Sequence, residues 1–239
     1  MMPKHHPDDA TLMSYSAGSL PLGAHLLVEC HLACCEHCRQ RVSEGDALGG
    51  ALLEHLPVSG MSMDNQAILA LLDQIESDQT KAGLAQSEKQ NVCTSRWAGH
   101  NPLPFDVPEW AKPIKQWLLD NHSGEEAVQW QKVAPGISQI KLESDSFYKD
   151  KAVRLLKIAP GTCMPTHGHT GSELTLILQG SYSDEAGRFR MGDVADLDPA
   201  IKHQPIADRD QDCICFIVTD APLRFDGWIP KLMQPFFGL

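Results

Sequence analysis

The sequence predicts a multidomain protein in which a small all-α domain is followed by an all-β domain. Apolar residues recur with helical spacing through the first 78 residues, whereas they alternate with a period of two from about Val128 onward. The stretch between these regions is polar and contains several glycines and prolines. We therefore expect a helical domain at residues 1–78, a linker at 79–108 and a β domain at 109–239.

The first three helices are expected from capping and breaking residues. Asp8 can cap the first helix and Gly18 suits its C-terminal end. Pro21 lies near the first turn of the second helix, where its missing N–H does no harm. The third helix should begin near Cys35 and end before Pro57.

A fourth helix is expected to begin at Asp64. Its apolar residues follow i, i+3, i+4, i+7 spacing and are Ile68, Leu71, Leu72 and Ile75. Such a face can lie in the groove of a partner protein, or it can pack inside its own domain, and the spacing suits both equally well.

The β domain is expected to be a sandwich or a barrel of short strands. Its clearest strands lie around Val153–Ile158, Leu174–Leu178 and Cys213–Val218, and each is apolar on both faces. Turn residues separate them, notably at 183–187 and 208–210. A short helix around Trp110 should precede the first strand.

Charge and hydropathy exclude some classes of function. The chain has 20 Lys and Arg against 31 Asp and Glu, a formal net charge of −11, so we expect no direct binding to nucleic acid. A basic protein partner would instead be attracted. No apolar run reaches about 18 residues and the N-terminus has no signal-peptide pattern, so we expect no membrane span and a cytoplasmic location.

Soft metal-binding residues are concentrated near the N-terminus. His31, Cys35 and Cys38 have the spacing H-x3-C-x2-C, and they can converge in the turn between the second and third helices. A tetrahedral zinc site needs a fourth ligand, which His5 or His6 can supply. Thiolate and imidazole together select zinc over hard ions such as magnesium.

A second ligand register is compatible with the same spacing. Cys30, Cys34 and His37 are separated by the same intervals, one residue earlier. Helical reasoning alone does not choose between the two registers. Because a reducing compartment disfavours disulfides, either register points to a metal rather than to a disulfide framework.

The N-terminal motif resembles that of the zinc-containing anti-sigma domains. The pattern is His6 followed by H31-x3-C35-x2-C38, and the opening HHPDDATLMSYSAGSLP resembles that of the ChrR-type anti-sigma factors. This resemblance covers about the first 80 residues. It implies that the zinc ligands are His6, His31, Cys35 and Cys38.

A second motif lies in the β domain. Gly161, His167, His169, Glu173 and Gly180 fit the pattern G-x5-H-x-H-x3-E-x6-G at every fixed position. On a strand, His167 and His169 project to one face. The spacing resembles the first cupin motif, which implies a double-stranded β-helix (jelly-roll) barrel with a metal site.

The second cupin motif is only partly present. Gly192 and His203 stand eleven residues apart, as that motif requires, but Asp198 occupies its proline position and Ala200 its second glycine. We therefore expect His203 to be the fourth ligand beside His167, His169 and Glu173. Three imidazoles and a carboxylate would accept zinc, manganese, iron or nickel.

The order of the two modules resembles the ChrR-type anti-sigma factors over nearly the whole chain. The resemblance implies a protein that sequesters an extracytoplasmic-function sigma factor through its zinc domain. It also implies that the cupin domain senses oxidative stress, with singlet oxygen or a peroxide as the trigger at the cupin site. No catalytic residue is expected.

Two other functions compete with this interpretation. The first is a metal-dependent cupin enzyme, an oxygenase or isomerase, with a helical zinc-binding appendage, because the cupin fold hosts many chemistries. The second is a zinc-dependent interaction module with a partner other than a sigma factor.

Overall fold

The computed structural model describes most of both predicted regions. The described residues are 2–57, 69, 74, 103–121, 129–142, 152–168, 171–197, 202–221 and 224–225. The chain divides into two compact units: Met1–Ala51 together with Leu103–Leu239, and Leu52–Pro102. The fourth predicted helix, apart from two helical positions at 69 and 74, and most of the predicted linker lie outside the described residues. The domain boundaries at 78 and 108 stay predictions.

The N-terminal helices begin and end where the capping residues predict. They are α1 (Asp9–Ser16), α2 (Leu22–Cys34) and α3 (Glu36–Glu54). The Thr11 backbone N–H donates to the Asp8 carboxylate at 2.6 Å, which caps α1. Gly18 follows α1 with φ +64°, a left-handed conformation that favours glycine. In the described ranges, no helix combines the length and apolar character needed to cross a bilayer.

The β region begins after a short helical segment, and the strand pairs among its described residues are antiparallel. The segment consists of η1 (Glu109–Ala111) and α5 (Lys112–Asn121). The strands are β1 (Gln131–Ala134), β2 (Ile137–Lys141), β3 (Ala152–Ile158), β4 (His167–Gly168), β5 (Glu173–Gln179), β6 (Ser181–Asp184), β7 (Gly187–Arg190), β8 (Val194–Leu197), β9 (Ile206–Ala207), β10 (Cys213–Thr219) and β11 (Arg224–Phe225). This order of a helical region and then an all-β domain confirms the predicted fold class.

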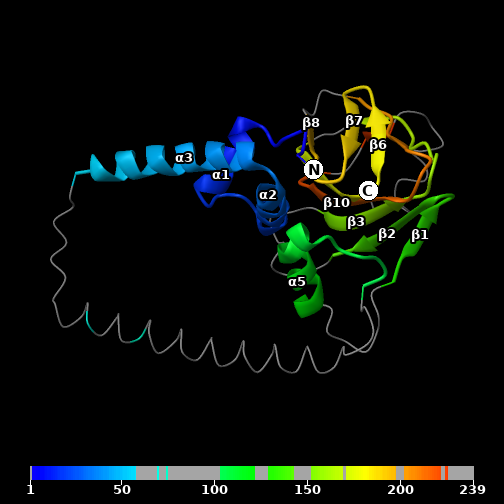
Figure 1. Cartoon of the computed structure of the whole chain (residues 1–239), viewed down its shortest axis with the longest axis horizontal. Coiled ribbons are helices and arrows are strands. Elements are labelled where there is room, and N and C mark those ends of the chain that lie inside the picture. The colour runs from blue at the N-terminus through cyan, green and yellow to red at the C-terminus, as the bar shows by residue number, and fades with distance from the viewer. Residues whose placement is uncertain are drawn as a thin grey trace. The chain divides into compact units, whose positions relative to one another are not determined.

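Three sheets contain these strands (Figure 1). The largest has the order β1-β2-β3-β10-β5-β8, a second has β7-β6-β9, and β11 pairs with β4. Within the part of the chain that the structure describes, hydrogen bonding does not join these sheets into one closed barrel. An isolated bridge between His167 and His203 nevertheless brings the two predicted cupin motifs together.

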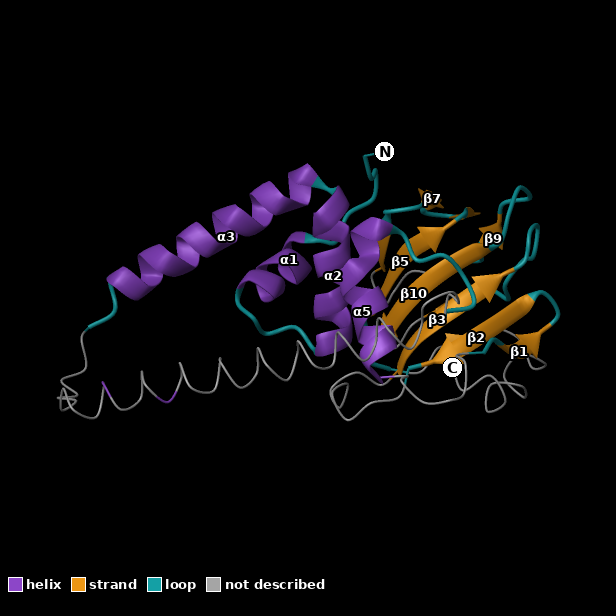
Figure 2. Cartoon of the chain, turned by 60° about the horizontal axis from the view of Figure 1, so that its bottom comes forward, coloured by secondary structure: helices purple, strands orange, loops and turns teal. Residues whose placement is uncertain are grey.

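The central strands β3, β10 and β5 are buried on both faces, as their apolar sequences predict. One face carries Leu155, Leu176 and Phe216 and packs against α2 and α5, so these helices and the sheet share one hydrophobic core. Figure 2 shows α2 and α5 beside this side of the sheet. The other face carries residues such as Leu156 and Cys215 and forms a second core inside the β domain. The helical region and the β domain are therefore packed as one unit.

Candidate metal centres

Four donor residues converge where α2 meets α3. His31 lies near the end of α2, Cys35 lies between the helices and Cys38 lies in the first turn of α3, while His6 comes from the N-terminal segment. His6 Nδ1 is 3.4 Å from His31 Nε2, and it is also 3.4 Å from each of the Cys35 and Cys38 Sγ atoms. His31 Nε2 lies 3.3 Å from Cys38 Sγ.

These separations fit a tetrahedral ion. With zinc–ligand bonds of about 2.0–2.3 Å, neighbouring nitrogen and sulfur ligands should lie roughly 3.3–3.7 Å apart. The Cys38 backbone N–H also donates to Cys35 Sγ at 3.5 Å, a contact that would stabilise a thiolate at Cys35. The four residues therefore form a cluster that could hold a metal.

The structure distinguishes the two candidate ligand registers. Cys30 is fully buried in the core that α2 shares with the sheet, and exposed His37 contributes no donor atom to the cluster. His5 also lies away from it, with its ring 4.2 Å from that of Phe189. The geometry thus brings together His6 and the H-x3-C-x2-C residues, which the family resemblance favoured.

Burial sets the electrostatics of this cluster. It raises the pKa of the Cys38 thiol to about 12 and lowers the pKa of His31 to about 4. Buried thiolates need a nearby positive charge, and a neutral imidazole has a free lone pair. A divalent cation supplies that charge and accepts that lone pair, so the donor set suits a cation bound by deprotonated cysteines.

A second cluster lies inside the β domain, where the structure brings together His167, Glu173 and His203. His167 is in β4, Glu173 begins β5, and His203 pairs with His167 through the isolated bridge. All three are buried, and the two imidazole Nε2 atoms are 3.0 Å apart. The remaining predicted ligand, His169, lies outside the described residues.

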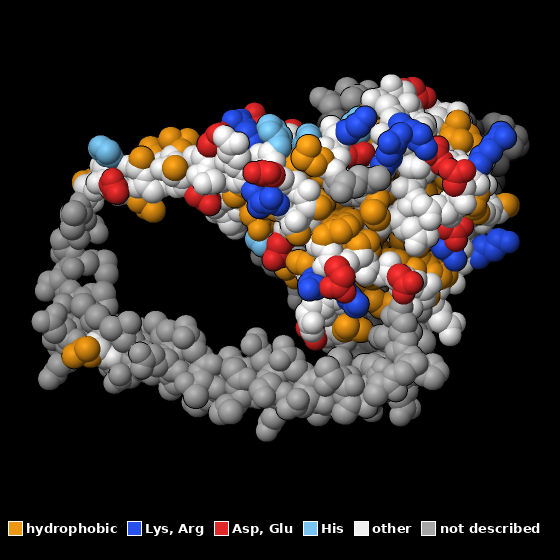
Figure 3. Space-filling model, viewed as in Figure 1, with side chains coloured by type: hydrophobic (Ala, Val, Ile, Leu, Met, Phe, Trp, Pro, Cys, Tyr) orange, Lys and Arg blue, Asp and Glu red, His pale blue; other side chains and the backbone are white. Residues whose placement is uncertain are grey.

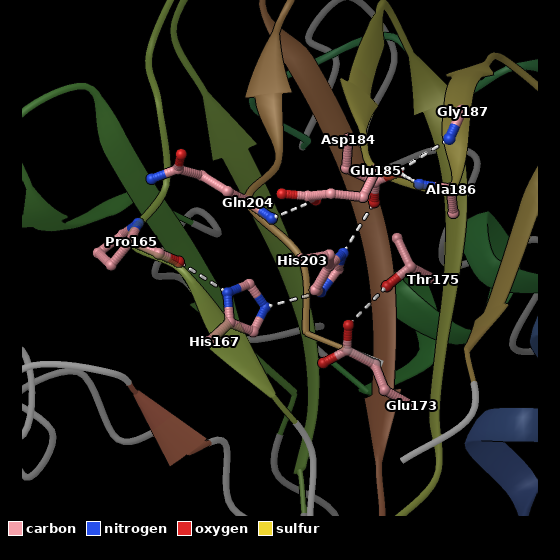
Figure 4. Close-up of polar contacts among 10 residues, drawn as sticks. All are labelled: Pro165, His167, Glu173, Thr175, Asp184, Glu185, Ala186, Gly187, His203 and Gln204. Carbon is pink, nitrogen blue, oxygen red and sulfur yellow. Dashed lines mark hydrogen bonds and ion pairs between the residues drawn. The ribbon is translucent and has the colours of Figure 1, made fainter. Parts of the chain in front are cut away.

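Hydrogen bonds orient both imidazoles toward a common point (Figure 4). His167 Nδ1 is 2.9 Å from the carbonyl oxygen of Pro165, and His203 Nδ1 is 2.8 Å from the Asp184 carboxylate. Both partners are acceptors, so each Nδ1 carries a proton, and in a neutral imidazole Nε2 then presents its lone pair. Two such nitrogens 3.0 Å apart need a proton or a metal cation between them, and a metal cation would use both lone pairs.

Asp184 contacts the second cluster, although its sequence neighbours indicate only a turn. Its Oδ1 accepts from the Ala186 and Gly187 N–H groups at 2.9 and 3.2 Å, which closes the β6–β7 turn. Its Oδ2 holds His203, and its side chain is completely buried. Carboxylate support of this kind raises the basicity of a metal-binding histidine. No spacing rule links residues 184 and 203, so the pairing appears only in the fold.

Burial also perturbs the carboxylate of the second cluster. It raises the pKa of Glu173 to about 7, while His203 and Arg154 act in the opposite direction. Thr175 donates a hydrogen bond to Glu173 at 3.4 Å. Burial lowers the pKa of His167 to about 4. A divalent cation would stabilise the carboxylate and use the neutral imidazole, so this donor set also suits a metal.

A cavity of about 40 Å³ borders this second cluster. Its polar wall includes His167, Glu173 and His203, and its apolar wall includes Leu156 and Ile217. This space exceeds what one water molecule requires. A metal held here could therefore keep a coordination position open to a small ligand.

The glycines of the two cupin motifs have the backbone that those motifs require. Gly180 has φ +70°, and a Cβ atom there would lie 2.5 Å from the Asp212 carbonyl oxygen. Gly192 has φ +89°. Asp198 and Ala200, where the second motif departs from its pattern, lie outside the described residues.

Similarity to known proteins extends over almost the whole chain. A family model described as the ChrR Cupin-like domain matches residues 122–222. The anti-sigma-E factor ChrR of Cereibacter sphaeroides is 37% identical over 238 residues, covering 99% of this chain and 99% of that protein. A chain in the crystal structure of Rhodobacter sphaeroides SigE in complex with the anti-sigma ChrR is 30% identical, with a TM-score of 0.64. That match covers 92% of this chain and 100% of the other.

Proposed function

The chain belongs to the ChrR family of anti-sigma factors, and we propose that it sequesters an extracytoplasmic-function sigma factor. In this proposal the helical region binds the sigma factor and the cupin domain controls its release under oxidative stress. The relatives support the partner class, because one is named an anti-sigma-E factor and the other is solved in complex with SigE. The net charge of −11 would speed the encounter with a basic partner.

An exposed row of leucines on α3 is the observation that carries the proposed binding. Leu48, Leu52, Leu53 and, just beyond the helix, Leu56 have between 54% and 69% of their surface exposed. Figure 3 shows hydrophobic side chains along this part of α3. An apolar helical face with i, i+4 spacing is suited to a partner's groove. The fourth predicted helix, a second candidate for this role, lies outside the described residues.

We infer that the N-terminal cluster binds zinc through His6, His31, Cys35 and Cys38. Two thiolates and two imidazoles form a complete tetrahedral set for that ion. The cluster joins α2, α3 and the N-terminal segment, so metal binding would stabilise the helical region that presents α3.

We infer that the cupin cluster binds a divalent metal, namely zinc, manganese, iron or nickel. His167, Glu173 and His203 would hold it, together with His169, which the first cupin motif predicts as a further ligand. The metal would supply a Lewis-acidic centre facing the adjacent cavity. This cavity is where singlet oxygen, a peroxide or a product of either would act to weaken sigma binding, and such a signal must discriminate between the free and sigma-bound states.

Binding to the sigma factor tests the proposal most directly. We expect the full chain to bind an extracytoplasmic-function sigma factor from its own genome and to block that factor's assembly with RNA polymerase. In isothermal titration calorimetry, the Leu48→Asp, Leu52→Asp variant should bind about 100-fold more weakly, because charges would enter an apolar contact. Ser43→Asp is the matched control, since nine residues place it roughly opposite Leu52 on α3.

The competing function predicts a different outcome. A metal-dependent cupin enzyme would convert a small molecule in the cavity, and neither the wild-type chain nor the leucine variant would affect transcription. Full sigma binding by the leucine variant would reject the α3 surface, whereas no binding by the wild-type chain would reject the anti-sigma proposal as a whole.

A further inference from the structure

The N-terminal segment runs along the edge of the β domain before it reaches the metal cluster. We call residues 4–11 the docking segment. The Lys4 and His5 backbone N–H groups donate to Asp193 Oδ1 at 2.6 and 3.2 Å, and the Val194 N–H donates to the His5 carbonyl oxygen at 3.2 Å. Asp193 is 2% exposed. The first anchor therefore joins the backbone of Lys4 and His5 to the buried Asp193 carboxylate and to the first residue of β8.

A second anchor lies at the other end of the docking segment. Asp196 Oδ2 accepts from the Asp8 N–H and from the Thr11 hydroxyl, both at 2.9 Å. Asp196 is in β8, which pairs with β5. Asp8 also caps α1, so this anchor joins the start of that helix to the sheet. His6 lies between the two anchors.

The same turn supports another donor of the metal cluster. His31 Nδ1 donates to the carbonyl oxygen of Gly192 at 2.8 Å, which leaves Nε2 free for a metal. A Cβ atom at Gly192 would lie 3.3 Å from Cys34 Sγ, so the turn packs closely on α2. The Gly192 N–H in turn donates to the Ile177 carbonyl in β5 at 2.9 Å. His6 and His31 are thus both positioned by the β domain.

Ring contacts continue from the docking segment to the cavity. The His5 ring lies 4.2 Å from that of Phe189, and Phe189 stacks on Tyr182 at 5.0 Å. Tyr182 lines the cavity beside the cupin cluster. The docking segment therefore contacts a residue that itself packs on the cavity wall.

We propose that the turn 190–194 and strand β8 are an outer support of the N-terminal metal cluster, so that docking of residues 4–11 and metal binding strengthen each other. This coupling rests on the proposed zinc site and concerns its regulation. By thermodynamic linkage, anything that loosens the docking segment weakens metal binding, and loss of the metal loosens docking by the same factor. A change in the cupin cavity would reach the sigma-binding region through this contact.

Zinc release tests one direction of the coupling. Zinc would be transferred from the full, zinc-loaded chain to a chromogenic chelator under pseudo-first-order conditions. We expect release from the N-terminal cluster to be about tenfold faster in Asp196→Ala and about threefold faster in Thr11→Val, because these variants lose two and one of the second anchor's hydrogen bonds. Asp208→Ala is the matched control, because it removes a carboxylate that accepts from Ser181 and Arg188 in the same domain.

The outcomes separate this inference from the proposal on which it rests. A wild-type chain that carries no metal at the N-terminal cluster would reject the zinc site and the coupling together. A loaded chain whose Asp196→Ala and Thr11→Val variants release zinc at the wild-type rate would reject the coupling alone. Equal acceleration by Asp208→Ala would also reject it, because the effect would then reflect general destabilisation.

Amide hydrogen exchange tests the opposite direction. In a Cys35→Ser, Cys38→Ser variant, we expect the Val194 amide, which donates to His5, to exchange at least about fivefold faster than in the zinc-loaded chain. The Phe216 amide in central β10 serves as the internal reference and should change less than twofold. Unchanged exchange at Val194 would contradict the coupling, whatever the sigma-binding result.

Discussion

The two candidate metal clusters orient most of their histidines in the same way but differ in what surrounds them. In three described histidines the Nδ1–H donates to an oxygen and Nε2 points at the other donors, namely His31, His167 and His203. His6 instead presents Nδ1 to its cluster. The N-terminal cluster has four described donors and packs beside Leu12 and Val28. The cupin cluster has three described donors and borders a cavity.

Under the proposed function, this difference assigns a structural role to the N-terminal cluster and a sensing role to the cupin cluster. Two thiolates and two imidazoles complete a tetrahedron and leave no position for a ligand, which is typical of structural zinc. Mixed nitrogen and oxygen donors beside a cavity leave room for a small molecule. The comparison therefore predicts that loss of the first metal damages sigma binding and loss of the second damages its regulation.

The largest effect is expected from Cys35→Ser, Cys38→Ser. The variant should lose the N-terminal metal and bind the sigma factor at least about 100-fold more weakly, because the α2–α3 junction loses its cross-link. Elemental analysis and calorimetry would measure the two losses. Cys34→Ser is the control, since Cys34 contacts the His31 carbonyl but is outside the cluster. Tight sigma binding by the double variant would contradict the proposed role of the N-terminal metal in sigma binding.

A smaller effect on binding is expected from His167→Ala, His203→Ala. Metal content should fall by one ion per chain while sigma affinity stays within about threefold of wild type, because the N-terminal donors are intact. Release of the sigma factor by peroxide or photo-oxidative stress should be lost in a reporter assay. His25→Ala, which removes an imidazole outside both clusters, should respond normally. A normal stress response in the double variant would show that the cavity is not the sensor.

The smallest change, Asp184→Asn, sharpens the comparison within the cupin cluster. The amide group would still close the β6–β7 turn through Oδ1, but it would present N–H to His203 and favour the wrong imidazole tautomer. We expect metal affinity at this cluster to fall about 10–100-fold, measured by competition with a chelator of defined affinity. Glu185→Gln alters the neighbouring carboxylate, which accepts from the Gln204 backbone N–H, and should leave the metal affinity unchanged. If Asp184→Asn and the wild type bound the metal with equal affinity, Asp184 would have no role in supporting the metal site.

Patterns within short segments predicted the local structure well. The capping Asp8 and the stop at Gly18 place α1 correctly, and the apolar strands centred on β3, β5 and β10 are buried on both faces. The spacing of His31, Cys35 and Cys38 also predicted a cluster that the structure assembles. These successes share a cause, because the helical and strand repeats act over a few residues.

The spacing argument left two choices open that contacts between distant segments resolve. His5 and His6 were equal candidates from spacing alone, and they differ only because His5 packs on Phe189. The register with Cys30 was equally allowed by spacing, and it fails because Cys30 lies in the core between α2 and the sheet. Neither contact follows from a periodic pattern.

The modules and most of their donor residues can be deduced from residue order, since helix capping, strand alternation and ligand spacing are local. Their union cannot. His31 donates to Gly192 across 161 positions of sequence, and the apolar face of α2 is buried against β5 and β10. The hydrophobic effect is non-directional, so an apolar stripe indicates that a helix face is covered but not which element covers it. In the folded chain the helical region and the β domain therefore share one of the buried cores, and the N-terminal segment docks on the β domain.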